Sequence, residues 1–316
     1  MRRKNGKNSK IHYYLVNGLR YIVPNSVYRA RLKRELSKFD KSPDRDYILD
    51  RVSYYNKLCS NRSLSINAKR LSALRLKEES SVYFFDTYEY TRWFNKSNKI
   101  DYLFGDITDI PKTPSIVKSR PIAGDNANSV LLNLNKSRHF TFLIDKVPFR
   151  DKLDKVIFRA HITDKPNRIK FMEMFFDNPM CSTGIISPSP QFPTEWAQKS
   201  ISLWAHLDYK FIMALEGNDV ASNLKWIMSS NSVAVMPKPK YETWFMEGRL
   251  IPNYHYIEIN DDFSDLTERL NYYIEHPEKA EAIAYNANKY IEQFKNQKRE
   301  DLISLMVLDK YFRLTL

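Results

Sequence analysis

Glycine is scarce in this sequence, with only 7 glycines in 316 residues. They are too few and too scattered to form a phosphate loop of the GxGxxG or GxxxxGK type, so a nucleotide must be held by another device. Cysteine is scarcer still, because Cys59 and Cys181 are the only two. This count excludes a disulfide framework and a cysteine-rich metal site, and it indicates a reducing compartment with two free thiols.

Long apolar runs are also missing. No run approaches the 18 or so residues that span a bilayer, and residues 1–19 are too polar for the apolar core of a signal peptide. We therefore expect a cytoplasmic protein that is either soluble or peripheral on the inner face of the membrane. With 43% hydrophobic residues, the chain can nevertheless bury two ordinary cores.

Positive charge is abundant but unevenly distributed. Residues 1–77 hold 20 lysines and arginines against 5 aspartates and glutamates, whereas the rest of the chain is close to neutral. Residues 26–39 read as an amphipathic basic helix with Arg29, Arg31, Lys33 and Arg34 on its polar side. Two interpretations stay open: a solvated helix face, or an anionic membrane surface bound through residues 1–40. No nucleic-acid-binding signature accompanies the charge, so no nucleic acid partner is expected.

The most informative stretch is residues 209–259. Residues 211–215 are apolar without alternation, which fits a parallel strand covered on both faces. A helix is expected from about Ala221, with Asp219 and Ser222 as acceptors for its first-turn amides. The start of a helix at the carboxyl end of a strand favours binding of an anion, and we expect a phosphate group there.

The same alternation extends in both directions. Strands are expected at 232–236 and 254–259, with a short helix at 244–250 between them, and the pattern strand, helix, strand is also expected over residues 81–106. The fold class is therefore α/β. Because the sequence turns polar near residues 145–154, we expect two domains, at 1–150 and 151–316.

Five separated motifs resemble glycosyltransferase family 90, which contains bacterial lipopolysaccharide-core and capsule glycosyltransferases and the Rumi-type protein O-glucosyltransferases. The motifs are KSRPI (118–122), LNKSRHF (134–140), IFRAHITDKPNR (157–168), EGNDVASNLKW (216–226) and ETWFMEGRLIPNYHYIEI (242–259). The resemblance covers roughly residues 101–294. It implies a GT-B fold, with two facing Rossmann-like domains, the donor held by the second and the acceptor by the first, and a last helix that crosses back.

The resemblance also implies a reaction and a donor site. The expected activity is inverting transfer of a sugar from a nucleotide-sugar, with a UDP-sugar as the expected donor, to a hydroxyl of a glycan or glycolipid acceptor such as lipopolysaccharide core, O-antigen or capsule. Arg168 fits the family's arginine that contacts the diphosphate, although a lone loop arginine is otherwise a surface charge. The remaining expected donor contacts are Gly217, Asp219, Ser222, Asn223, Lys225 and Glu247, of which Glu247 could either bind ribose hydroxyls or end a short helix.

For the catalytic base the resemblance points to Asp106, with Asp109 as the alternative, although an isolated loop aspartate is otherwise a turn residue. Ser119 and Arg120 are expected on the acceptor side. No DxD motif stands where a metal would bridge a diphosphate, so we expect no metal and no cofactor. Asn223 stands where Rumi-type members carry an arginine. This departure leaves a second interpretation open, a non-catalytic membrane-surface or glycan-binding scaffold that has kept the fold.

Overall fold

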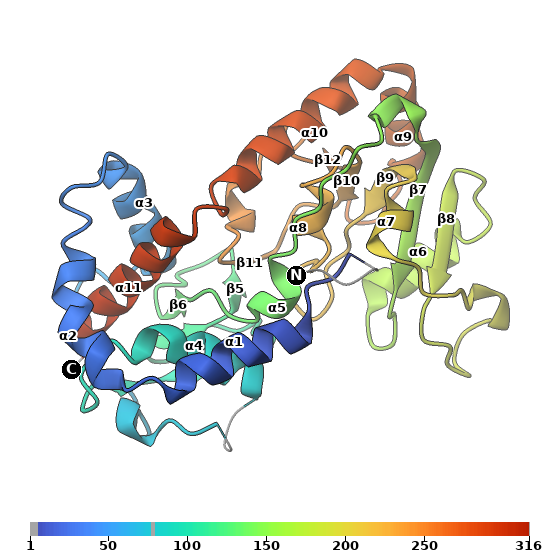
Figure 1. The fold of residues 1–316 in the computed structure, drawn as a ribbon. Coiled ribbons are helices and arrows are strands. Elements are labelled where there is room, and N and C mark those ends of the chain that lie inside the picture. The colour runs from blue at the N-terminus through green and yellow to red at the C-terminus, as the bar shows by residue number, and fades with distance from the viewer. Residues whose placement is uncertain (1–5, 77–79, 316) are drawn as a thin grey trace. The chain divides into compact units, whose positions relative to one another are not determined.

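The computed structural model describes residues 6–76 and 80–315, drawn in Figure 1. The chain forms two compact units. The sheet unit contains Arg138–Pro239, Arg249–Gln293 and the described residues up to Asn8; the helical unit contains Ser9–Ser137, Lys240–Gly248 and the segment from Phe294 onward. After a first passage at Asn8 and Ser9, the chain passes from the helical unit to the sheet unit at residues 137 and 138, about a dozen residues before the boundary expected at 150 and 151.

The sheet unit is built on one five-stranded sheet whose strands are all parallel. Its order is β12-β10-β9-β7-β8, with β7 at Leu153–Ala160, β8 at Cys181–Ile185, β9 at Tyr209–Met213, β10 at Val233–Met236 and β12 at Ile257–Glu258. The helices of this unit are α6 at Pro166–Phe175, α7 at Leu203–His206, α8 at Leu224–Ile227, α9 at Leu266–Glu275 and α10 at Pro277–Glu292. The strands predicted at 211–215 and 232–236 are thereby confirmed within two residues at each end.

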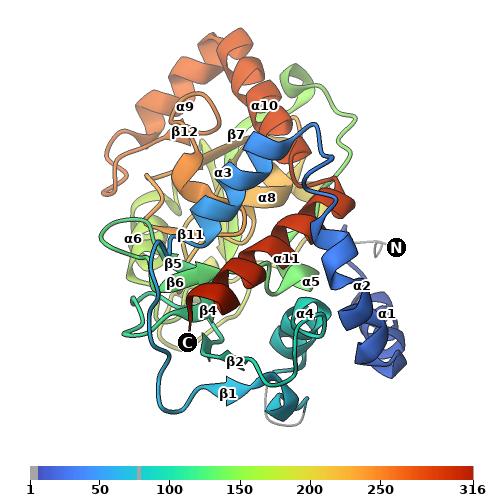
Figure 2. The ribbon, with the colours of Figure 1, turned by 90° about the vertical axis from the view of Figure 1, so that its left-hand side faces the viewer.

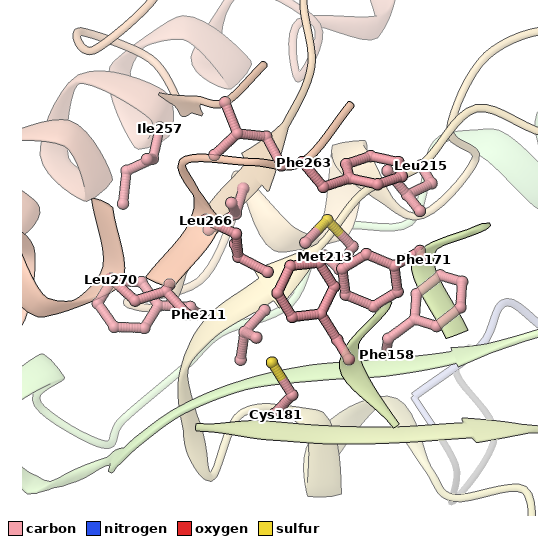
Figure 3. Close-up of a cluster of buried hydrophobic side chains, with 14 of the residues drawn as sticks. Phe158, Phe171, Cys181, Phe211, Met213, Leu215, Ile257, Phe263, Leu266 and Leu270 are labelled. Atoms are coloured by element: carbon pink, nitrogen blue, oxygen red, sulfur yellow. The ribbon is translucent and has the colours of Figure 1, made fainter. Parts of the chain in front are cut away.

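Alternate residues of the strands build the core of the sheet unit. Phe158 of β7 and Phe211 and Met213 of β9 point to the same face, because side chains alternate along a strand. There they meet Phe171 of α6 and Leu266 of α9, as Figure 3 shows. The apolar runs in the sequence therefore come from strands buried against helices.

The helical unit surrounds small sheets with helices. The helices are α1 at Lys10–Ile22, α2 at Asn25–Leu36, α3 at Arg45–Tyr55, α4 at Ser81–Thr91 and α11 at Gln297–Leu314, and α5 at Lys136–His139 spans the change of unit. A three-stranded parallel sheet contains β3 (Tyr102–Leu103), β4 (Ser115–Val117) and β6 (Ser129–Leu131). Two antiparallel strand pairs accompany it: β1 (Lys69–Arg70) with β2 (Lys99–Ile100), and β5 (Ser119–Pro121) with β11 (Tyr241–Thr243). The α/β class is confirmed, with parallel strands in both units.

Three expected elements differ from the observed ones. The strand predicted at 81–86 is wrong, because these residues begin α4. Phe84, Thr87 and Thr91 are buried at helical spacing, so packing overrides the preference of aromatic and β-branched residues for strands. The helix predicted from Ala221 is the single turn α8, and the one predicted at 244–250 is the short 3-10 turn Glu247–Arg249.

A buried ion pair joins α3 to α11 inside the helical unit, where Figure 2 shows the two helices side by side. Arg51 donates from Nη1 and Nη2 to the two carboxylate oxygens of Glu300, over 2.6 and 2.9 Å. Trp244 Nε1 also donates to Glu300, over 2.7 Å, and its ring stacks on Tyr55 at 3.7 Å between centroids. The carboxylate is thus fully satisfied, which is the condition for a buried pair to be tolerated.

Candidate active site

The parallel sheet has one point where its strand order reverses. β8 follows β7 on one side, whereas β9 lies on the other side of β7, and β10 and β12 continue outward from β9. In open α/β sheets ligands bind at such a switch point, outside the carboxyl ends of the two strands involved. The relevant ends are those of β7 and β9, at Ala160 and Met213.

Arg168 lies at this switch point, on the first turn of α6 rather than in a loop. Its Nη1 donates to the carbonyl of His161 (2.9 Å), its Nη2 to that of Leu215 (2.8 Å) and its Nε to that of Glu216 (3.1 Å). His161 follows β7, and Leu215 and Glu216 follow β9, so the guanidinium joins the two strand ends. A guanidinium has five N–H donors, so one N–H on each Nη remains for an anion.

The charge of Arg168 has no acidic partner within the described residues. Burial, followed by the positive charge of Arg138, lowers the pKa of its guanidinium to about 10. Arg138 itself is exposed. Two neighbouring cations without a carboxylate between them create a positive potential that favours a bound anion.

Gly217 allows the guanidinium to lie against the main chain. A Cβ at this position would be 3.1 Å from Nη2 of Arg168, which is closer than ordinary van der Waals contact. Glycine is thus the residue type that fits beside Arg168, and the placement of both residues agrees with a shared role.

The other residues of the sheet unit that were predicted to contact the donor are less well placed to bind a phosphate. Lys225 is fully buried and Asp219 is only 4% exposed, so neither presents its charge to solvent. Asn223 donates from Nδ2 to the carbonyl of Met213 (2.9 Å) and thereby ties the loop to the end of β9; Ser222 is partly exposed. Because α8 is a single turn, its dipole and amides offer little to a phosphate, and the helix start at the switch point belongs to α6.

In the helical unit, Asp106 follows β3 and forms an ion pair with Lys118, which follows β4. Ser119 fixes the same loop, because its hydroxyl accepts from the amide of Ile107 (3.1 Å) and donates to the carbonyl of that residue (3.2 Å). The side chain of Asp106 remains 25% exposed. The carboxylate is therefore held in place, yet a hydroxyl group can still reach it.

Two neighbouring candidates are placed differently. Asp109 is exposed and makes no hydrogen bond or ion pair with the described residues. Arg120 is fully buried, donates to Glu242 over 2.8 Å and binds the main-chain carbonyls of Tyr54 (2.7 Å) and Ser129 (3.0 Å). Such a guanidinium holds the unit together, which does not fit the predicted contact between Arg120 and an acceptor.

Glu247, expected at the ribose, also turns inward. Its carboxylate accepts from the amide of Thr243 (2.7 Å) and from the hydroxyl of the same residue (3.0 Å), and it is 2% exposed. It thus stabilises the turn after β11; it begins the 3-10 turn Glu247–Arg249 and does not end a helix.

Residues 6–76 and 80–315 contain no cluster of three or more histidines, cysteines, aspartates or glutamates that could hold a metal ion. Of the helices described, none combines the length and the apolar character needed to cross a bilayer.

Two cations have no role in the sequence-based prediction. They are Lys118, beside Asp106 in the helical unit, and Arg138, near Arg168 in the sheet unit, and they belong to the motifs KSRPI and LNKSRHF. Lys118 was predictable in principle, since the ends of neighbouring parallel strands share one edge of a sheet and Asp106 also follows such a strand. Arg138 acts across 30 positions in sequence, and no local pattern indicates that distance.

The fold and the cationic switch point define an α/β protein with a candidate anion site at the carboxyl edge of its parallel sheet. The family profile described as "Glycosyl transferase family 90" matches residues 137–315. Over 307 residues, 96% of each chain, the sequence is 39% identical to a protein named "O-glucosyltransferase LpsA" from Dichelobacter nodosus. The chain belongs to glycosyltransferase family 90 and is a glycosyltransferase, which confirms the resemblance found in the motifs.

Proposed function

We propose that this glycosyltransferase moves a sugar from a nucleotide-sugar, a UDP-sugar in the first instance, to a hydroxyl of a glycan acceptor with inversion of configuration. Acceptors of the kind found in lipopolysaccharide core, O-antigen or capsule fit this proposal. The relative's name, O-glucosyltransferase, makes glucose the first sugar to test. The GT-B architecture and a cytoplasmic location belong to the same proposal; the latter is supported by two cysteines that form no disulfide.

The observation that carries the proposal is the geometry of Arg168. Transfer releases a nucleoside diphosphate, so negative charge grows on the leaving oxygen as the anomeric bond breaks. Arg168 is pre-oriented by the carbonyls of His161, Leu215 and Glu216 and keeps two N–H groups for phosphate oxygens. Arg138 adds a second positive charge nearby.

Asp106 is the proposed general base. In a single displacement the acceptor oxygen attacks the anomeric carbon, the bond to the diphosphate breaks and the acceptor proton passes to the carboxylate. The ion pair with Lys118 holds the carboxylate in place after β3. Ser119 holds the loop at Ile107 and thereby fixes where the carboxylate lies; it is a positioning residue.

We propose further that no metal is needed, because the two arginines supply the positive charge at the diphosphate. Full activity after exhaustive treatment with EDTA is the expected result. Activity that is lost with EDTA and restored by Mg²⁺ or Mn²⁺ would contradict this part alone.

The central test is a panel of nucleotide-sugars assayed for hydrolysis without acceptor, followed by transfer with the sugar that reacts. The anomeric configuration of the product, read by NMR coupling constants, is expected to be opposite to that of the donor. A retained configuration would reject the single displacement, and no reaction with any UDP-, GDP-, ADP- or CMP-sugar would reject a nucleotide-sugar donor.

A further inference from the structure

Helix α1 packs on α4 through one face only. Tyr13 donates its hydroxyl to Asp86 of α4 over 2.7 Å, Arg20 pairs with Glu89 at 2.5 Å, and Asn17 is buried. Figures 1 and 2 both show α1 running beside α4. These contacts fix the rotation of α1 about its axis and so determine which side chains point away.

The opposite face of α1 is a stripe of aliphatic side chains. Ile11, Leu15, Leu19 and Ile22 are 69%, 62%, 67% and 78% exposed. Their spacing of four, four and three residues places them on one side of a helix. Single exposed apolar residues are normal, but a continuous exposed stripe of this kind marks a contact surface. We call these four residues the α1 stripe.

Exposed basic side chains follow α1 along the chain, on helix α2. Arg29, Arg31, Lys33 and Arg34 of α2 are all exposed, and α2 has no buried residue. The helix predicted at 26–39 is observed as α2, which ends at Leu36; its basic residues are exposed and its leucines, Leu32 and Leu36, are only partly buried. A hollow of about 460 Å³ lies where the two helices meet; its lining includes Ile22, Arg29 and Lys96.

We infer that the α1 stripe docks on an anionic phospholipid bilayer, with α1 lying in the plane of the interface. The four aliphatic side chains enter the boundary between headgroups and acyl chains, and the cations of α2 contact lipid phosphates. Thirteen residues make α1 about 20 Å long, so it lies on the membrane and does not span it.

Charge complementarity favours an anionic bilayer over a second copy of the chain as the partner of the α1 stripe. Residues 1–77 carry 20 cationic against 5 anionic side chains, so two α1 stripes packed together would bring like charges side by side. Such a contact is repulsive. An anionic surface satisfies the apolar and the basic parts together.

The inference rests on α1 and α2 and is independent of the proposed function. The test is flotation of the whole protein with vesicles of phosphatidylcholine containing about 30 mol% phosphatidylglycerol, which gives a surface potential like that of a cytoplasmic leaflet. The test variant is Leu15→Gln with Leu19→Gln, since glutamine keeps a good helix propensity. The matched control is Leu49→Gln in α3, where the leucine is 44% exposed but lies outside the stripe.

We expect the wild type and Leu49→Gln to bind anionic vesicles alike and the double variant to bind about 100-fold more weakly, because two leucines no longer enter the bilayer. Arg29→Gln with Lys33→Gln should weaken binding about fivefold per charge, and pure phosphatidylcholine should bind poorly. Circular dichroism and nucleotide binding should not change. Equal binding by the wild type and the double variant overturns the inference. So does a concentration-dependent dimer that the double variant abolishes without any vesicle binding by the wild type, because the stripe would then join two copies.

Discussion

Replacing Arg168 by glutamine should separate nucleotide binding from stability. The variant loses about three hydrogen bonds to carbonyls, each worth about 1 kcal/mol. It also removes a charge whose pKa is lowered to about 10 by burial and by Arg138, and holding that charge costs about 3 kcal/mol. The two effects oppose each other at similar size, so the free energy of unfolding should change by only about 1 kcal/mol.

The affinity for UDP should fall much further. Each charge-assisted hydrogen bond to phosphate is worth about 1.5–3 kcal/mol, so the loss of even one of the two that Arg168 can make should weaken UDP binding about 10- to 150-fold in isothermal titration. Arg168→Lys should fail as well, because the three N–H groups of an ammonium are taken up by the three carbonyls.

Arg150→Gln is the matched control. Arg150 belongs to the same unit, and its side chain is 59% exposed and pairs with Glu281 at the surface. Its loss should leave UDP affinity unchanged. A folded Arg168→Gln protein that binds UDP within twofold of the wild type would refute the assignment of the diphosphate to the switch point. An equal loss of UDP affinity in Arg150→Gln would show that the lower net charge of the protein explains the effect of Arg168→Gln.

Three further predictions concern other residues. Asp106→Asn should lower the turnover number about 10²–10⁴-fold with UDP affinity intact, whereas Asp109→Asn should stay near wild type; the reverse order in a transfer assay would exchange their roles. Gly217→Ala should weaken UDP binding, measured by titration, because its Cβ would lie 3.1 Å from the guanidinium beside it. Burial raises the pKa of the Asp86 carboxyl to about 6, so the folded state holds this proton to higher pH than the unfolded state does. Stability should therefore fall by up to about 3 kcal/mol as pH rises from about 4 through 6, and Asp86→Asn should flatten that fall in urea unfolding curves.

The sheet unit was largely predictable from its sequence. Residues 211–215 and 232–236 are short apolar runs, and parallel strands buried on both faces produce such runs. The role proposed for Arg168 could be predicted only from the motif that contains it, because its three carbonyl partners lie 7 and 47 or 48 positions away. A sequence pattern shows the periodicity of one helix or strand, but it does not show which residues far apart in the sequence are in contact.

The helical unit was harder to predict, for the same physical reason. Residues 81–86 have the composition of a strand but form a helix, since Phe84 and Thr91 are buried about two turns apart on α4. The exposed face of α1 is apolar and the face packed on α4 is partly polar, with Asn17 buried and Tyr13 partly buried. The rule that apolar residues are buried therefore predicts the wrong face of α1 to be packed against the protein.

The pairing of Arg51 with Glu300 has a consequence for the order of folding during synthesis. The two residues are 249 positions apart, so α3 is complete long before its partner helix has been translated. Until then the Arg51 guanidinium has no carboxylate, and the site it occupies in the finished protein would leave a buried charge uncompensated. The helical unit therefore cannot close around α3 as the chain emerges from the ribosome, whereas all five strands of the parallel sheet have been made before residue 294. Folding should run against the order of the sequence, with the later-made sheet settling first and the amino-terminal helices waiting for α11.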